Sequence, residues 1–129
     1  MKQIDVSIII LTKNAGEKFR KVLSGIFSQS FKSFEVIIID SDSTDNTLEI
    51  AKQYLTKIIK IKTEDFGHGK TRNLGAKLAK GKYVVYLTHD AIPKDKNWLY
   101  ELIKPLKKDK KIVGVFSRQV PKENENEID

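Results

Sequence analysis

Residues 34–47 read FEVIIIDSDSTDNT, an apolar run that ends abruptly in a cluster of acidic side chains. The run Val36–Ile39 contains no polar residue, which is typical of a strand covered on both faces of a sheet. Asp40, Asp42 and Asp45 follow within six residues, and three carboxylates are more than a turn requires. The stretch therefore predicts a buried strand that opens into a polar loop, with Asp45 placed to cap the next helix.

Strand and helix patterns alternate on both sides of this stretch. Further apolar runs predict strands at Val6–Leu11, Ile58–Ile61, Tyr83–Leu87 and Ile112–Phe116. Apolar residues at helical spacing predict helices over 19–27, 48–55, 70–80 and 98–106, and Pro105 is expected to kink or end the last one. This alternation predicts an α/β fold, a doubly wound, mostly parallel sheet with helices on both faces. The C-terminal ends of such strands share one edge, where ligands bind.

The composition is that of one soluble domain. The chain has 129 residues, 40% of them hydrophobic, with 24 Lys and Arg against 17 Asp and Glu. We expect one α/β domain over residues 1–120 and a polar acidic tail over 121–129. The absence of cysteine excludes disulfides, thiolate metal sites and cysteine nucleophiles. With no apolar run of membrane length and no signal-like start, we expect a cytoplasmic protein.

The basic charge is concentrated late in the chain, at Lys104, Lys107, Lys108, Lys110 and Lys111. A lysine cluster at a helix end is usually a solvated face favoured by the helix dipole. Attraction to the anionic inner face of a membrane is the alternative, and it predicts peripheral membrane association. Aromatic residues are not interleaved with the lysines as a nucleic-acid platform requires, so we expect no nucleic-acid partner.

Three familiar ligand motifs are incomplete. Only Gly16 follows the first strand, so the G-x-G-x-x-G dinucleotide fingerprint is absent. Ala51 stands where an EF-hand loop needs its bidentate glutamate. Glu64 stands where a P-loop needs glycine, yet the glycines before Lys70 and Arg72 still lead into a helix N-terminus. That arrangement predicts an anion or diphosphate cradle.

Polar side chains follow three of the predicted strands. Thr12 and Asn14 come after the first and could bind a ligand or simply close a turn. Asp40 comes after the second, at the expected switch point of the sheet, where ligand contact is favoured over a solvated turn. Asp90 follows the fourth, and its carboxylate suits Mg²⁺ or Mn²⁺ bridging phosphates. His89 is a second candidate ligand, although imidazole matches a hard cation less well.

The segment from Asp40 to Thr44 also resembles the D-x-D-x-T string of the haloacid-dehalogenase phosphatases. In that family the first Asp is the phosphorylated nucleophile and the second an acid/base, which would give these roles to Asp40 and Asp42. The family carries the string on its opening strand and adds a further acidic pair, and neither feature is found here.

Taken together, the motifs resemble the family 2 inverting glycosyltransferases of GT-A fold. The matching stretches are VSIIILTKN, FSQSFKSFEVIIIDSDSTDNT, GKTRNLGAKLAKGKYVVYLTHD and VFSRQVP. The resemblance implies that Thr12, Asn14, Asp40 and Asp42 bind the nucleoside of a sugar donor, with Asp40 at the base. Lys70 and Arg72 then approach the diphosphate, and Thr88, His89 and Asp90 occupy the place of the family's D-x-D metal motif.

Departures from the family pattern refine this expectation. Thr88 replaces the first acid of the metal motif, and Lys13 replaces a common tyrosine. The T-x-D-A form with a later R-Q-x-P resembles a rhamnosyltransferase-like branch, which implies a dTDP-linked donor.

The acceptor side of the family pattern is missing. Members are markedly longer than this chain, and nothing after Phe116 matches their acceptor-binding half, which carries the catalytic base. We therefore expect a donor-binding half that is inactive alone, self-associates through an exposed apolar face, and belongs to an enzyme with a saccharide or lipid-linked acceptor. The alternatives are an Asp40 phosphatase and a non-catalytic nucleotide-binding module.

Overall fold

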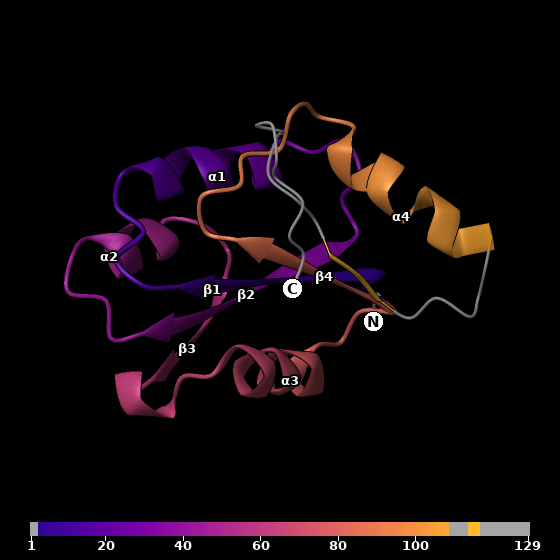
Figure 1. Ribbon diagram of the computed structural model, residues 1–129. Coiled ribbons are helices and arrows are strands. Elements are labelled where there is room, and N and C mark those ends of the chain that lie inside the picture. Colours follow the sequence, from indigo (N-terminus) through magenta and orange to yellow (C-terminus); the bar gives the residue numbers. More distant parts are fainter. Residues whose placement is uncertain (1–2, 109–113, 117–129) are drawn as a thin grey trace, which may run out of the picture.

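Five parallel strands form one sheet in the order β3-β2-β1-β4-β5 in a computed structural model that describes residues 3–108 and 114–116 (Figure 1). The strands are β1 Val6–Thr12, β2 Phe34–Ser41, β3 Lys57–Ile61, β4 Tyr83–Thr88 and β5 Gly114–Phe116. The helices are α1 Lys18–Phe27, α2 Thr47–Ala51, α3 His68–Leu78 and α4 Trp98–Lys108, with a short 3-10 turn η1 at Thr63–Asp65. The doubly wound parallel sheet expected from the alternating pattern is confirmed.

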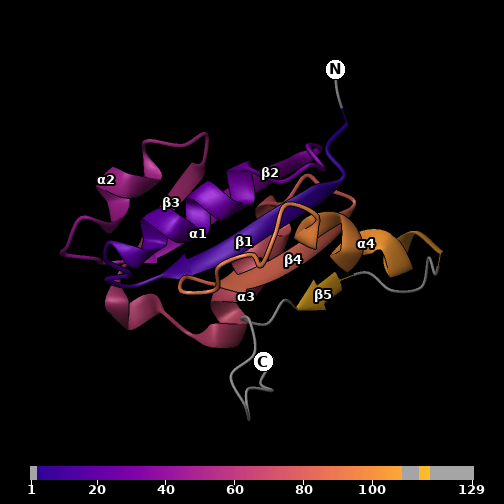
Figure 2. The ribbon, with the colours of Figure 1, turned by 90° about the horizontal axis from the view of Figure 1, so that it is seen from above.

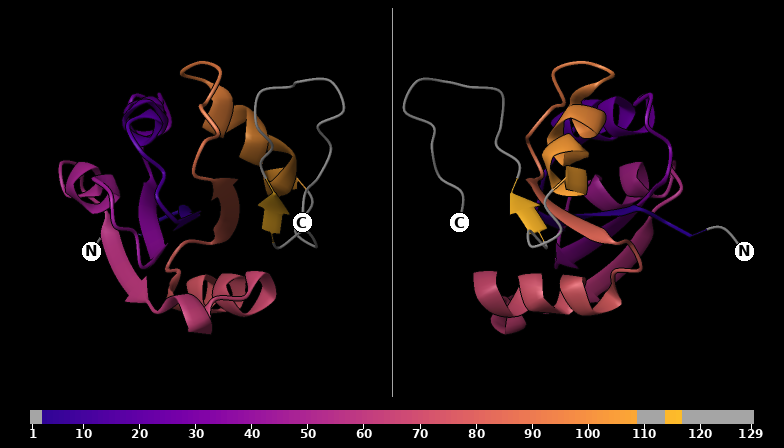
Figure 3. Two further views of the ribbon diagram at one scale, coloured as in Figure 1. Left: turned by 60° about the vertical axis from the view of Figure 1, so that its left-hand side comes forward. Right: turned by 90° about the vertical axis from the view of Figure 1, so that its right-hand side faces the viewer.

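Helices cover both faces of the sheet. Seen from above, α1 and α4 lie across one face (Figure 2), and the turned views place α3 on the opposite face (Figure 3). The larger core cluster joins this first face to α1, α2 and α4 through buried side chains such as Ile8, Phe19 and Leu99. The smaller cluster joins Ile9, Ile37 and Ile39 to α3. Consecutive strand residues face opposite layers, so the continuous apolar runs supply both clusters.

The helix α3 approaches the sheet closely because it carries glycine at position 75. A Cβ atom there would lie 2.7 Å from Ile9 Cγ2 and 3.3 Å from Ile39 Cδ1. Separations this short are not tolerated without movement of the neighbours. Gly75 therefore fixes the depth at which α3 packs on β1 and β2.

Two predicted helices differ from those observed. The helix α2 ends at Ala51, and Leu55, expected on its inner face, is 89% exposed in the loop before β3. The apolar spacing continued past the point where the backbone leaves the helix. The helix α4 does not end at Pro105 but runs to Lys108, since proline removes one backbone donor without preventing the next turn. Ile112, Val113 and the tail 121–129 lie outside the described residues.

Asp45 does begin α2 as expected. Its Oδ1 accepts the backbone N–H of Thr47 at 3.0 Å, although Asn46 is the residue next to the helix. Within residues 3–108 and 114–116, no helix has the length and apolar character needed to cross a bilayer.

Candidate functional site

The strand register brings the polar ends of β1, β2 and β4 to one edge of the sheet. Thr12 pairs with Asp40 on β2, and Leu11 pairs with Thr88 on β4. Because all strands run parallel, the loops after Thr12, Asp40 and Thr88 leave from the same side. The sequence-predicted residues of these three loops are therefore neighbours in space.

The strand order reverses between β1 and β4, since the chain moves outward from β1 through β2 to β3 and then returns to β4 on the other side. Crevices that hold ligands form at such a switch point. Thr12 and the Thr88–Asp90 turn flank it directly. Asp40, which we expected at the switch point, lies one strand away.

Asp40 is fully buried and serves the loop that follows it. Its Oδ1 accepts hydrogen bonds from Thr12 Oγ1 and Ser43 Oγ, both at 2.6 Å, and its Oδ2 accepts from the backbone N–H of Ser43 at 3.0 Å. Every oxygen of the carboxylate is thus engaged inside the protein. Because the side chain is 0% exposed, a direct contact with a ligand base, as the resemblance implies, requires neighbouring atoms to move.

Asn14 joins the loop after β1 to the loop after β2. Its backbone adopts a positive φ of 49°, which asparagine tolerates better than most residues. Its Oδ1 accepts the backbone N–H of Thr44 at 2.7 Å and that of Asp45 at 3.3 Å. Its own N–H donates to Ser43 Oγ at 2.8 Å. The two loops therefore form one hydrogen-bonded unit.

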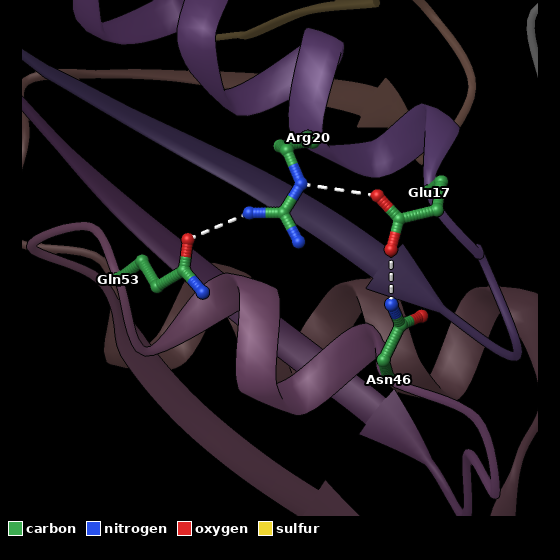
Figure 4. A network of polar contacts seen from close by, with 4 residues as sticks. All are labelled: Glu17, Arg20, Asn46 and Gln53. Atoms are coloured by element: carbon green, nitrogen blue, oxygen red, sulfur yellow. Dashed lines mark hydrogen bonds and ion pairs between the residues drawn. The ribbon is translucent and has the colours of Figure 1, made fainter.

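Polar side chains in and beside α1 and α2 extend this unit outward (Figure 4). Arg20 Nε donates to Glu17 Oε1 at 3.1 Å, and Arg20 Nη1 donates to Gln53 Oε1 at 2.7 Å. Asn46 Nδ2 donates to the second oxygen of Glu17. The Arg20 guanidinium, with help from Asn46, lowers the pKa of Glu17. Because this network is exposed to water, it aligns the two helix starts more than it stabilises the fold.

Asp42 ties a third loop to the same edge. Its side chain is exposed, its φ is 52°, and its Oδ2 accepts the N–H of Thr63 at 3.0 Å. This backbone hydrogen bond is the main reason that the pKa of Asp42 lies below its usual value. Lys13 Nζ donates to the carbonyl of Asp42 and to Thr63 Oγ1, both at 3.3 Å. Lys13 thus bridges the loops of β1, β2 and η1.

The alternation of side chains separates the predicted residues into two sets. Thr12 and Asp40 face the layer of α1 and α2, like the buried residues two positions before them. Leu11 and Tyr86 belong to the cluster beneath α3. Ser41 follows Ile39 of the same cluster by two residues, and Thr88 follows Tyr86 by two residues. Both side chains therefore point to the side of the sheet that faces α3. The side facing α3 is therefore where a ligand could meet both the sheet edge and the helix.

The N-terminus of α3 lies at this edge because the helix runs antiparallel to the strands it crosses (Figure 1). The first turn is closed by Thr71, whose N–H donates to the carbonyl of Gly67 at 2.7 Å. Lys70 is exposed and Arg72 is half-buried. Free helix N–H groups and two cations provide positive potential for an anion at this position.

Arg72 also contacts the end of β4. Its guanidinium carbon lies 5.9 Å from the ring centre of Tyr86, and Tyr86 Oη donates to the carbonyl of Arg72 at 3.1 Å. Tyr86 precedes Thr88 by two residues on the same side of the strand. Arg72 of α3 is therefore in contact with the strand that leads into the loop carrying Asp90.

Asp90 is exposed beyond β4 and accepts a hydrogen bond from Thr88 Oγ1 at 3.0 Å. His89 Nδ1 is buried without a hydrogen-bond partner among the described residues, so that nitrogen does not face a ligand at the edge. No group of three or more His, Asp or Glu side chains suited to a metal occurs within 3–108 and 114–116. One exposed carboxylate fits an Mg²⁺ or Mn²⁺ ion that draws its other ligands from phosphates and water.

Several residues of the site were not singled out from the sequence. Ser43 and Thr63 hold the acidic loop through hydrogen bonds to Asp40 and Asp42. Thr47 accepts the N–H of Ala15 through its hydroxyl at 2.9 Å. The density of Ser and Thr among the acids was a usable signal for such loop closure. Tyr86 carried no signal, because an aromatic residue inside an apolar strand is typical of a core position.

Comparison with known proteins agrees with this geometry. Residues 7–129 match Glycosyl transferase family 2. The O-antigen chain rhamnosyltransferase WbaN of Salmonella anatum is 38% identical over 124 residues, which cover 95% of this chain and 39% of that protein. The O-antigen chain rhamnosyltransferase RfbN of Salmonella typhimurium is 36% identical over 129 residues, with 95% and 40% covered. The chain thus spans about two fifths of the length of these relatives.

Solved structures share the fold. The structure of Staphylococcus aureus TarS residues 1–349 in complex with UDP superposes with a TM-score of 0.74 at 29% identity, covering 92% of this chain and 38% of that one. The Pyrobaculum calidifontis mannosyltransferase PcManGT, in complex with GDP-Man and Mn²⁺, gives 0.72 at 25% identity, covering 82% and 33%. The fold, the motifs in their order and the family match over nearly the whole chain agree, and the chain belongs to glycosyl transferase family 2.

Proposed function

We propose that this chain binds the nucleoside diphosphate of a sugar donor at the C-terminal edge of β1 and β4. The observation that carries the proposal is that the α3 N-terminus, with Lys70 and Arg72, and the exposed Asp90 lie at the same C-terminal edge of the sheet. Cations and helix N–H groups suit the phosphates, and a carboxylate suits a metal bridging them. The UDP and GDP-Man complexes of TarS and PcManGT support this choice of ligand.

The loops after β1 and β2 form the nucleoside side of this site. Thr12, Asn14 and Asp40 hold one another and Ser43 in a fixed arrangement, and Asp42 is exposed beside them. A preformed loop loses little conformational entropy when a ligand binds. We assign Asp40 and Thr12 the task of keeping this loop in shape, and Asp42 and Asn14 that of bordering the nucleoside.

Mg²⁺ or Mn²⁺ is the proposed cofactor, held by Asp90 together with the phosphates. When bound, such an ion supplies charge stabilisation for the departing diphosphate. Thr88 offers a hydroxyl where a second carboxylate would be stronger, and His89 is assigned a minor part because its Nδ1 is enclosed. The affinity of the protein for the ion alone should therefore be low.

For the whole protein we propose transfer of the sugar, with inversion, to a saccharide or lipid-linked acceptor. The relatives named as O-antigen chain rhamnosyltransferases support a role in polysaccharide synthesis. A dTDP-linked donor is proposed from the T-x-D-A and R-Q-x-P motifs of the sequence. We assign the protein to the cytoplasm, at the inner face of a membrane, where such acceptors are presented. Self-association is a further proposal, based on the apolar surface that an acceptor-binding half would cover.

The phosphatase alternative has less support. A phosphorylated nucleophile must be reachable by the phosphate it attacks. Asp40 is 0% exposed, and both of its oxygens accept internal hydrogen bonds. A non-catalytic nucleotide-binding module would use the same edge, and an acceptor-dependent transfer assay on the longer protein separates it from an enzyme.

Charge removal on α3 tests the site. Arg72→Gln should weaken binding of UDP or dTDP by about 1.5–3 kcal/mol, as expected when a charged hydrogen bond is lost. Lys77→Gln removes a cation from the last turn of the same helix, far from the edge, and should leave affinity unchanged. Equal losses in the two variants, measured by calorimetry, would mean that only overall charge matters and that the site is misplaced.

A further inference from the structure

We propose that Tyr86 is a positioning residue that holds Arg72 for the diphosphate, an inference that rests on the proposed function. The side chain of Tyr86 contacts Arg72 twice, through its ring and through its hydroxyl. Tyr86 would act through Arg72, without touching the ligand.

The two contacts constrain different parts of Arg72. The hydrogen bond of 3.1 Å from Tyr86 Oη fixes the backbone carbonyl, and hence the height of the first turns of α3 above β4. The ring face lies 5.9 Å from the guanidinium carbon, within the range in which an aromatic quadrupole attracts a cation. Backbone and side chain are therefore held by one residue.

The surrounding packing makes Tyr86 an effective anchor. Gly75, one turn after Arg72, allows α3 to lie directly on Ile9 and Ile39. Tyr86 itself pairs with Ile9 on β1, so ring and helix rest on the same central strands. With the helix fixed at Gly75, the hydroxyl of Tyr86 determines how its N-terminal part is inclined toward the sheet edge.

The chemistry of the phenol suits this task at neutral pH. Burial raises the pKa of Tyr86, and the nearby charge of Arg72 lowers it by a smaller amount. The phenol therefore stays protonated and keeps its O–H as a donor for the carbonyl. A flexible arginine loses rotamer entropy when it binds phosphate. Because the ring already restricts the Arg72 side chain in the free protein, less of this entropy is lost on binding.

Tyr86→Phe removes the hydroxyl and keeps the ring, so it tests the proposal with little change in packing. Loss of one neutral hydrogen bond should weaken UDP and dTDP binding roughly two- to tenfold. Uridine and thymidine, which lack the phosphates, should bind to Tyr86→Phe with the same affinity as to the unmodified chain. Tyr86→Leu removes both contacts and should weaken diphosphate binding further. Tyr83→Phe is the matched control, since Tyr83 lies on the same strand and faces the opposite cluster.

A positioning role also predicts dependence on Arg72. In an Arg72→Ala background, Tyr86→Leu should weaken UDP binding no more than Tyr86→Phe does, to within about twofold, because no guanidinium remains for the ring to hold. In the ligand-free chain, the NMR signals of the labelled Tyr86 ring should shift in Arg72→Gln, which reports the ring contact independently of nucleotide binding. In Tyr86→Leu, the NMR signals of the Arg72 side chain should be averaged over several rotamers, because the ring that holds the guanidinium is gone.

Several outcomes would overturn the inference. These are equal losses of UDP and uridine affinity in Tyr86→Phe, unchanged UDP affinity in Tyr86→Leu, and an extra loss from Tyr86→Leu over Tyr86→Phe that is undiminished in the Arg72→Ala background. If the unmodified chain binds UDP and dTDP but Tyr86→Phe is indistinguishable from it, only this inference fails. If the unmodified chain binds neither nucleotide, the proposed function fails with it.

Discussion

Asp40 shows how one side chain can be central to a site while lying wholly inside the protein. It accepts from Thr12 and Ser43 with both oxygens, whereas Asp42, two residues later, is exposed and accepts from Thr63 through one oxygen. Asp40→Asn must therefore turn its NH₂ group toward an internal donor. We predict that it lowers the free energy of unfolding by about 1–3 kcal/mol, measured by urea denaturation.

The control for this prediction is Asp42→Asn. Asparagine tolerates the positive φ at this position, and its oxygen can still accept from Thr63. Its effect on unfolding should be close to zero. If the two substitutions cost the same, the internal bonds of Asp40 do not hold the loop.

Asp45 links acid stability to the same loop. Its hydrogen bonds with the side chain and then the backbone of Thr47 lower its pKa in the folded protein. A lowered folded-state pKa contributes stability above the unfolded value of about 4, and this contribution is lost as the pH falls through the folded value. The difference in unfolding free energy between the unmodified chain and Asp45→Asn should therefore shrink from about pH 6 to about pH 3. A difference that stays constant over this range would contradict the prediction.

At the scale of single residues, the sequence located the polar loops but not the contacts within them. The acids at 40, 42 and 45 stood out because they follow an apolar run. Whether each acid faces a ligand or the protein interior depends on which residue of the neighbouring strand lies beside it. Thr12 lies beside Asp40 only once the sheet has formed. Tyr86 could not be distinguished from core aromatics, since its role depends on a helix that precedes it by several residues.

Among the elements, α3 shows most clearly how packing places the site. Gly75→Ala would put a Cβ 2.7 Å from the branched Cγ2 of Ile9. We predict that this substitution destabilises the fold by about 1–3 kcal/mol through overpacking, measured by thermal and urea unfolding. It should also weaken nucleotide binding by displacing the first turn of α3.

Gly69→Ala, in the first turn of the same helix, provides the comparison. A Cβ there meets nothing within 4 Å, so the higher helix propensity of alanine should leave stability equal or slightly raised. Two substitutions of equal effect would indicate that helix propensity, and not close packing on the sheet, governs α3.

Element types and order were predictable because each apolar run and each helical stripe lies within one segment. Element ends were less so. Leu55 continued the stripe of α2 although the backbone had already left the helix, and Pro105 did not end α4. The error at Leu55 arises because local spacing does not record where the chain must turn to reach the next strand.

For the molecule as a whole, we predict that these 129 residues bind a donor but transfer sugar negligibly. Transfer requires a base within about 2.6–3.2 Å of the acceptor hydroxyl. Asp40 is enclosed by internal hydrogen bonds, and Asp42 and Asp90 are assigned to the nucleoside border and the metal. Donor consumption should be measured over a panel of saccharide acceptors. Repeated turnover would show that a base lies within this chain.

The most direct test of the central claim is a calorimetric titration of the 129-residue chain with UDP and dTDP, in Mn²⁺ and in chelator. Because Asp90 would share an ion with the phosphates, the account predicts that at least one nucleotide binds. Its affinity should be several-fold higher in Mn²⁺, and Asp90→Asn should abolish that gain while keeping the affinity seen in chelator. A folded chain that binds neither nucleotide under either condition would contradict the account.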